Sequence, residues 1–279
     1  MKPIKLYSGT AVRRLIQTRP KTFRRCLIAI LSLVLSFSRL PSAQAVTASL
    51  RPLADTTLQE AFPNNNSGDG TSFQTGGRRK GGRTRGLLRF DIAGNLPVGA
   101  TINSATLTLT VVGVPSGGVN SLFDLNRVLV SWGEGNGSDH GGSLGGAGQA
   151  TWNNRLGSGT PWTAAGGDYS STVSASRSIT GFGSSTFSST ANLVLDVQGW
   201  LNTPANNFGW LMRSESEFTP TSIRRFASRD DLANSPLLTI TYTVVPEPGP
   251  SLLLGVGTLA LIWRSRVFAN RRLLQGRTL

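Results

Sequence analysis

One short segment, residues 105–111, constrains the fold of this chain more than any other feature of its sequence. It reads ATLTLTV, so that apolar and hydroxyl side chains alternate strictly along it. A repeat of two residues is typical of a β-strand that buries one face and exposes the other. The buried face is expected to carry Ala105, Leu107, Leu109 and Val111.

The segment just before it predicts a second strand, over residues 86–91. Leu87 or Leu88, together with Phe90, would face inward. Turn-forming residues at Asn95, Pro97 and Gly99 separate the two strands. The chain is therefore expected to be an all-β protein with antiparallel strands.

The remaining sequence up to residue 244 contains turn signals every 8 to 15 residues or so and no long helical repeat. These roughly 200 residues are within the size of a single all-β domain. A long polar segment, residues 133–167, predicts a loop that is either functional or disordered. A short helix or 3₁₀ turn is expected over residues 196–201. The remaining strands are predicted at residues 122–130, 176–180, 192–197, 209–213, 225–228 and 237–244.

The net charge of +14 suggests a nucleic-acid or membrane partner, but its distribution along the chain argues against that interpretation. Of the 28 basic residues, nine precede residue 46 and five follow residue 263. The middle of the chain holds 14 basic and 13 acidic residues, so it is nearly neutral. The basic excess is typical of targeting segments, and no nucleic-acid partner is expected.

The first 45 residues have the features of a secretory signal peptide. Arg24 and Arg25 precede an apolar run of about 12 residues, which is shorter than the roughly 20 needed to cross a bilayer as a helix. Ala43 and Ala45 supply the small residues that a signal peptidase requires, which predicts cleavage after Ala45. Cys26 is the one cysteine and lies in this segment, so the mature chain would hold no disulfide and no thiolate metal site.

Residues 245–279 contain a second targeting pattern with three parts. Pro246, Glu247 and Pro248 keep the chain extended, and an apolar run over residues 252–263 can enter the membrane transiently. Arg264 and Arg266 begin a basic end that favours the cytoplasmic side. A plain tail anchor is the alternative interpretation.

This three-part tail resembles the PEP-CTERM sorting signal of Gram-negative bacteria. The resemblance implies recognition by an exosortase and delivery to the cell surface, the outer membrane or the extracellular matrix. With the signal peptide, it implies a secreted protein whose domain occupies residues 46–244.

That domain resembles the DNRLRE-domain proteins, a carbohydrate-binding-module-like β-sandwich family found on secreted microbial proteins. The similarity begins with LLRFD at residues 87–91, LPVGATI at 96–102 and SATLTL at 104–109, and covers residues 54–243. Later matching segments are VSWGE at 130–134, ATWN at 150–153, DVQGW at 196–200, FGW at 208–210 and RFASR at 225–229. The family commonly has Glu where this chain has Asp230. The resemblance implies a β-sandwich, of jelly-roll type, that associates with polysaccharide.

Two groups of residues are candidates for binding. The glycine-rich segment 76–86 carries Arg78, Arg79, Lys80, Arg83 and Arg85, and predicts a hairpin that presents several cations together. Guanidinium groups bind carboxylates and sulfates, so an anionic polysaccharide is a sensible partner. A solvated, flexible turn is the alternative interpretation.

The second group consists of Trp152 and Trp162, which lie in the long polar segment. An exposed indole there could stack on the CH face of a sugar ring. Trp132, Trp200 and Trp210 each adjoin a predicted strand and are expected in the core.

Catalytic patterns are weak in this sequence. His140 is the one histidine, so a multi-histidine zinc site is excluded, and no metal or cofactor is expected. Residues 141–145 read GGSLG and match the G-x-S-x-G pattern, but no strand enters the pattern and no helix leaves it. Neighbouring carboxylates at Glu215 and Glu217, or at Asp230 and Asp231, are more typical of turns than of a glycosidase pair.

The sequence therefore predicts a secreted, non-catalytic β-sandwich that binds or associates with extracellular polysaccharide. Two alternatives remain open. A polysaccharide-degrading enzyme, either a lyase or a hydrolase, would need convergent carboxylates or a Tyr-Arg-His set. A structural matrix component would have neither such a set nor a discrete ligand site.

Overall fold

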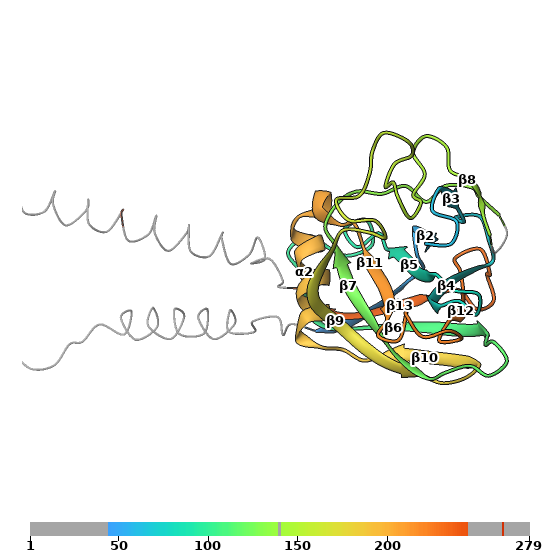
Figure 1. Cartoon of the computed structure of the whole chain (residues 1–279). Coiled ribbons are helices and arrows are strands. Elements are labelled where there is room, and N and C mark those ends of the chain that lie inside the picture. The colour runs from blue at the N-terminus through green and yellow to red at the C-terminus, as the bar shows by residue number, and fades with distance from the viewer. Residues whose placement is uncertain (1–43, 139–140, 245–263, 265–279) are drawn as a thin grey trace, which may run out of the picture. The chain divides into compact units, whose positions relative to one another are not determined.

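A computed structural model of the chain describes residues 44–138, 141–244 and 264 (Figure 1). Residues Ala43–Val245 form one compact unit. In the described part of this unit the structure is mostly antiparallel β, as the alternating sequence predicts.

The described strands and helices of this unit fall into two groups along the chain. The first group ends within the long loop and comprises β1 (Ala45–Leu50), β2 (Ala54–Gln59), β3 (Asn65–Asn66), β4 (Ser72–Gly77), β5 (Arg83–Arg89), β6 (Thr101–Gly113), β7 (Ser121–Val128) and β8 (Ser143–Leu144). The second group comprises β9 (Tyr169–Ile179), β10 (Gly183–Phe187), α2 (Ala191–Asn202), the 3₁₀ helix η1 (Pro204–Asn206), β11 (Trp210–Ser214), β12 (Arg224–Ala227) and β13 (Leu237–Thr243).

Eleven of these strands form one curled sheet. Its order is β1-β13-β6-β12-β4-β5-β11-β7-β9, with β10 also paired to β6 and β2 also paired to β5. Strand β4 joins two halves of this sheet, one that runs from β1 to β12 and one that runs from β5 to β9. The first residues of β4 pair with β12, and its last two, Gly76 and Gly77, pair with β5. The curl lets the two halves face each other across a core.

The main hydrophobic cluster lies between these two halves. One half contributes Leu107 and Leu109 from β6, and the other contributes Phe123 from β7 and Trp210 from β11, all fully buried. The threonines between the apolar residues of β6 are half-buried on the opposite face. The predicted inward face of this strand is therefore confirmed.

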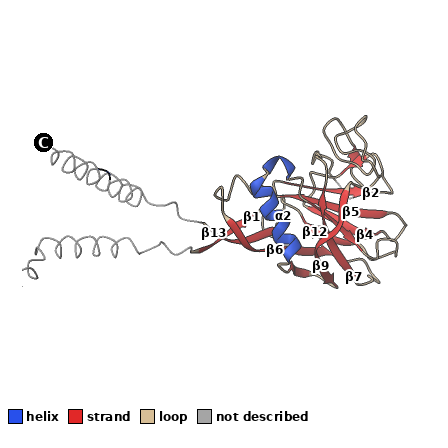
Figure 2. Ribbon diagram, turned by 90° about the vertical axis from the view of Figure 1, so that its left-hand side faces the viewer, coloured by secondary structure: helices blue, strands red, loops and turns tan. Residues whose placement is uncertain are grey.

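Helix α2 closes one end of the main cluster (Figure 2). The prediction of a strand over residues 192–197 is wrong, because these residues belong to a helix that begins at Ala191. Thr190 caps it by accepting a hydrogen bond from the backbone N–H of Leu193 (3.0 Å). The buried residues Leu193, Val197, Trp200 and Leu201 recur with helical spacing, which is the signal that identifies this face.

A second hydrophobic cluster lies on the other face of the half-sheet that contains β5 and β11. Leu87 and Leu88 are both buried because adjacent strand residues point to opposite faces, Leu88 into the main cluster and Leu87 into the second one. The long polar loop after β7 supplies Trp132, Ala150, Trp152 and Trp162 to this second cluster. The loop is therefore a folded cover over the sheet.

The predicted processing sites lie at the margins of the described residues. Ala45 is exposed and opens β1, where it faces Thr243 of β13. Arg264 is described as an exposed helical residue. The remaining predicted sites, Ala43, Pro246, Glu247, Pro248 and Arg266, lie outside the described residues. No helix in the described ranges is both long enough and apolar enough to cross a membrane.

Candidate ligand-binding surface

The turn between β4 and β5 is a glycine-rich hairpin, as predicted. Gly77 pairs with Arg83, and the loop closes through a hydrogen bond from the backbone N–H of Arg78 to the carbonyl of Gly82 (3.0 Å). Gly81 and Gly82 have φ values of 86° and 89°, a region that favours glycine. This geometry places Arg78, Arg79 and Lys80 side by side at the tip.

The three residues at the tip differ in their surroundings. Arg79 and Lys80 are exposed, whereas Arg78 is half-buried. The Arg78 guanidinium donates a hydrogen bond to Oε1 of Gln59 (2.8 Å) and lies 4.9 Å from the centre of the Phe62 ring. Burial lowers the pKa of Arg78 from its usual value. Arg78 is therefore held in one orientation.

Arg83 does not present a free charge, and the prediction that it joins the exposed cations is wrong. Its side chain donates two hydrogen bonds to the carboxylate of Glu60, at 2.9 and 2.7 Å, and its backbone N–H donates a third. These hydrogen bonds hold the pKa of Glu60 below its usual value. The guanidinium lies between the rings of Trp152 and Phe218, about 5 Å from each centre.

Arg85 is a buried structural residue. It donates two hydrogen bonds to Glu217, at 3.0 and 2.8 Å, and one to the carbonyl of Gly166 (2.9 Å). Both side chains of this ion pair are less than 10% exposed. Arg85 thus joins β5 to the loop before β12 and to the long cover loop, and it takes no part in an exposed cationic surface.

Trp152 and Trp162 are 3% and 4% exposed, so the prediction that they offer a stacking surface to a sugar is wrong. Trp152 packs in the second cluster beneath the guanidinium groups of Arg83 and Arg85. Trp162 packs in the same cluster and donates a hydrogen bond from its indole N–H to the carbonyl of Thr151 (2.8 Å). A polar loop sequence does not reveal which of its aromatic residues fold back onto a sheet.

Two phenylalanines provide exposed aromatic area beside the turn. Phe62 is 40% exposed and contacts Arg78, and Phe218 is 78% exposed and contacts Arg83. The sequence analysis did not identify either residue, although an aromatic ring between polar turn residues is a usable signal. We call the surface that they form with the tip the basic–aromatic turn; its members are Phe62, Arg78, Arg79, Lys80, Arg83 and Phe218.

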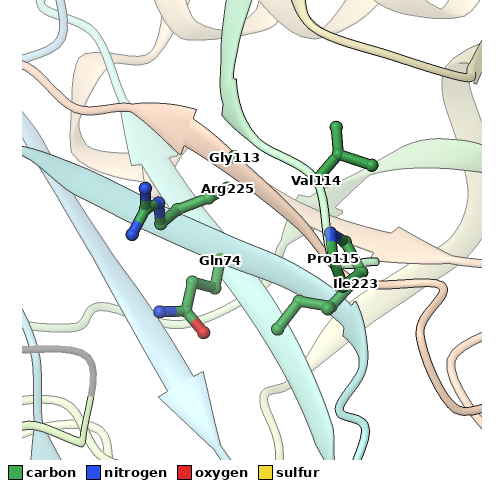
Figure 3. Close-up of a pocket in the computed structure, with 6 residues that line it drawn as sticks. All are labelled: Gln74, Gly113, Val114, Pro115, Ile223 and Arg225. Atoms are coloured by element: carbon green, nitrogen blue, oxygen red, sulfur yellow. The ribbon is translucent and has the colours of Figure 1, made fainter. Parts of the chain in front are cut away.

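A pocket of about 280 Å³ opens near the base of the same hairpin (Figure 3). Val114, Pro115 and Ile223 form an apolar wall, and Gln74 and Arg225 supply polar groups. A Cβ atom on Gly113 would lie 2.7 Å from Nε of Arg225, so glycine at this position lets the arginine cross β6. Ile223 connects the pocket to the turn, because its backbone N–H donates to the carbonyl of Gly77 (3.2 Å).

A cluster of acidic residues surrounds Arg229 elsewhere on the domain. Glu134 lies 2.7 Å from Nε of Arg229 and also accepts a hydrogen bond from the backbone N–H of Asp55 (2.8 Å). Burial raises the pKa of Asp55 to about 7 and raises that of Glu134 above its usual value. Asp230, where the resembled family has Glu, lies 3.9 Å from Arg229. Because its partners belong to β2, the long loop and the corner after β12, this cluster holds three segments together.

The residues that the sequence analysis considered for catalysis lie in separate parts of the domain or outside the described residues. Ser143 lies in the two-residue strand β8, which pairs with β3, and the next element along the described chain is the strand β9. His140 lies outside the described residues. Glu217 is buried against Arg85, whereas Glu215 is exposed. Within residues 44–138 and 141–244, no three or more His, Cys, Asp or Glu residues gather in a way that could hold a metal ion.

Comparison with known proteins adds no further identification. No protein-family model matches the chain, and a search of curated proteins finds no match.

Proposed function

We propose that the chain is a secreted surface or matrix protein whose jelly-roll-like β-sandwich binds anionic polysaccharide without catalysing a reaction on it. The observation that carries this proposal is the basic–aromatic turn. Arg79 and Lys80 are exposed at the tip of one hairpin next to the half-buried Arg78, the exposed ring of Phe62 contacts Arg78, and the exposed ring of Phe218 contacts Arg83.

The chemistry of the turn suits a polymer of acidic sugars. A guanidinium forms paired hydrogen bonds with a carboxylate or sulfate, and a lysine adds a mobile positive charge. Aromatic rings can pack on the apolar CH face of a sugar. Because Arg83 and Arg85 are paired with Glu60 and Glu217, the charge available to a ligand comes from the three residues at the tip.

The proposed route to the cell surface rests on the two terminal segments. Signal peptidase would cleave after Ala45, and an exosortase would act at the Pro246-Glu247-Pro248 motif after transient insertion of the apolar run that follows it. This route would place the domain on the surface, or in the extracellular matrix, of a Gram-negative bacterium.

Affinity electrophoresis tests the proposal. Fragment Ala43–Val245 is run through gels that contain alginate, pectin or a neutral glucan, at low and at high salt. We expect retardation in the two acidic gels and a smaller effect at high salt, because exposed charges are screened over about 8 Å at physiological ionic strength. Arg78→Ala/Arg79→Ala/Lys80→Ala should abolish retardation, and Phe62→Ala/Phe218→Ala should weaken it.

A matched control removes three positive charges elsewhere on the domain. Arg51, Arg127 and Arg177 are exposed and lie outside the turn, so their replacement by alanine should leave retardation nearly unchanged. Equal losses in the two triple variants would show a general charge effect and contradict a specific site. If the wild type migrates unretarded in every gel, the structural alternative is favoured; shortening of the polymer would favour the enzyme alternative.

A further inference from the structure

Strand β1 forms one edge of the curled sheet. It pairs with β13 in an uninterrupted register from Ala45–Thr243 to Leu50–Leu238. Among the described residues, no strand pairs with its other side. Its first three residues are exposed, including Val46 at 42%.

A free strand edge offers a row of backbone N–H and C=O groups to any other strand. Native proteins usually protect such an edge with charged residues, proline, a bulge or a covering segment. The sequence of β1 is AVTASL, which contains no charge and no proline, and its pairing with β13 shows no bulge. By contrast, the register between β13 and β6 shifts between Thr241 and Tyr242.

We propose that two copies of this chain associate through β1, which pairs with β1 of the second copy in an antiparallel orientation about a two-fold axis. Facing residues in antiparallel strands lie on the same side of the sheet. Thr47 would therefore face Thr47 or Ser49 of the other copy, and Val46 would face Ala48 or Leu50. In the register that pairs Thr47 with Ser49, hydroxyl groups meet hydroxyl groups and apolar groups meet apolar groups throughout, whereas in the other register Ala45 would face Ser49.

Existing contacts within the sheet support this match. Thr47 and Thr241 place their hydroxyl oxygens 3.4 Å apart, and Ser49 and Thr239 do the same. Pairing through β1 would extend these hydroxyl rows across the two-fold axis and would cover the exposed side chain of Val46. Arg51, the first charged residue after β1, would lie at opposite ends of the paired strands, so the two copies would not repel each other there.

The size of the contact sets its strength. Six residues span about 20 Å, and a strand pair of this length buries less than the roughly 1,000 Å² expected of a stable specific interface. The association is therefore reversible and depends on concentration. It does not depend on polysaccharide binding, since β1 and the basic–aromatic turn are different parts of the sheet.

Sedimentation velocity over a series of protein concentrations tests this proposal on fragment Ala43–Val245, which contains both hydrophobic clusters. The wild type should shift from monomer to dimer as its concentration rises. Thr47→Lys should remove the dimer, because it places a positive charge at the centre of the paired strands. Hydrogen exchange should show that backbone amides of β1 become protected as the wild type associates.

Thr106→Lys is the matched control. Thr106 lies on the same outer face of the sheet, in β6, and pairs with Thr239 away from the edge. This variant should dimerise like the wild type. A wild type that stays monomeric at every concentration overturns the proposal, as does a Thr47→Lys variant that still dimerises. Loss of the dimer in both variants would indicate association through the sheet face and would also overturn it.

Discussion

The carboxylate of Asp55 accepts a hydrogen bond of 2.7 Å from the backbone N–H of Arg229, which lies 174 residues further along the chain. This contact joins the start of β2 to the corner after β12. Since the Asp55 side chain is almost completely buried, its protonation is linked to the stability of the domain.

The first prediction concerns that linkage. The folded pKa of Asp55, about 7, lies above its usual value of 3.8, so the folded state binds the proton more tightly than the unfolded state does. The stability linked to this proton is complete below the usual pKa and is lost as the pH rises through 7. The rise in the pKa of Asp55 from 3.8 to about 7 corresponds to roughly 4 kcal/mol of unfolding free energy.

Urea unfolding at several pH values between about 5 and 8 measures this effect. Asp55→Asn keeps an oxygen that can accept the hydrogen bond from Arg229 but cannot ionise. The free energy of unfolding should fall with pH in the wild type and fall less in Asp55→Asn. Parallel curves for the two proteins would show that Asp55 does not carry the pH dependence.

The second prediction concerns the buried ion pair between Arg85 and Glu217. Glu217→Gln leaves the buried guanidinium without its counter-charge and should destabilise the domain by about 3–5 kcal/mol. Glu215→Gln makes the same change two residues away at an exposed position and should have little effect. Denaturant unfolding compares them, and equal stabilities for both variants would contradict the structural role of the pair.

The third prediction tests the inward face of β6. Leu107 is fully buried, so Leu107→Asp places an unpaired charge in the main cluster and should abolish cooperative unfolding. Thr106→Asp puts the same side chain on the outer face and should leave the transition cooperative. Circular dichroism during heating distinguishes these outcomes. A cooperative melt of Leu107→Asp near the wild-type temperature would mean that the face is assigned incorrectly.

The fourth prediction separates stability from binding in the second cluster. Trp152→Ala removes a buried indole and should cost about 3–5 kcal/mol of unfolding free energy. Phe218→Ala removes an exposed ring and should change stability far less, while it weakens retardation in the acidic gels. If Trp152→Ala leaves the unfolding free energy unchanged, the cover loop does not stabilise the sheet.

The fifth prediction concerns maturation. Mass spectrometry of the protein recovered from its host should find an N-terminus near Val46 and a C-terminus near Pro246. The β1 strand would then begin almost at the mature N-terminus, with Val46 opposite Tyr242. Surface protein that retains Arg264 and the residues after it would contradict exosortase processing.

The residues of β6 show why much of this fold could be predicted from the sequence. One face of this strand meets the core and the other meets solvent. Apolar and polar residues therefore alternate along it, and this alternation predicts the burial of Leu107 and Leu109. Strand β5 lies between two clusters and buries both Leu87 and Leu88, so the alternation disappears. For that reason the sequence did not show which of these two leucines faces the main cluster.

The candidate binding surface was only partly predictable, because partners distant in sequence decide which charges remain available. Arg78 and Arg83 look alike in the sequence, but Glu60, the residue directly after the neighbouring strand β2, neutralises Arg83. Phe62 and Phe218 meet the hairpin from segments that are far apart along the chain. Such contacts depend on strand order, which local patterns do not encode.

The two ends of β6 also define how the domain would carry a mechanical load. Thr243, the last residue of β13, pairs with Thr101 at one end of β6. Gly113, at the other end of β6, pairs with Arg225, which in turn pairs with Gln74 in β4, the first strand of the hairpin that carries the basic–aromatic turn. A pull between a ligand held by the turn and an attachment beyond Thr243 would therefore run along the strands. The hydrogen bonds that join β13 to β6 and β1 would resist it together in shear, whereas a peeling force would break them one at a time.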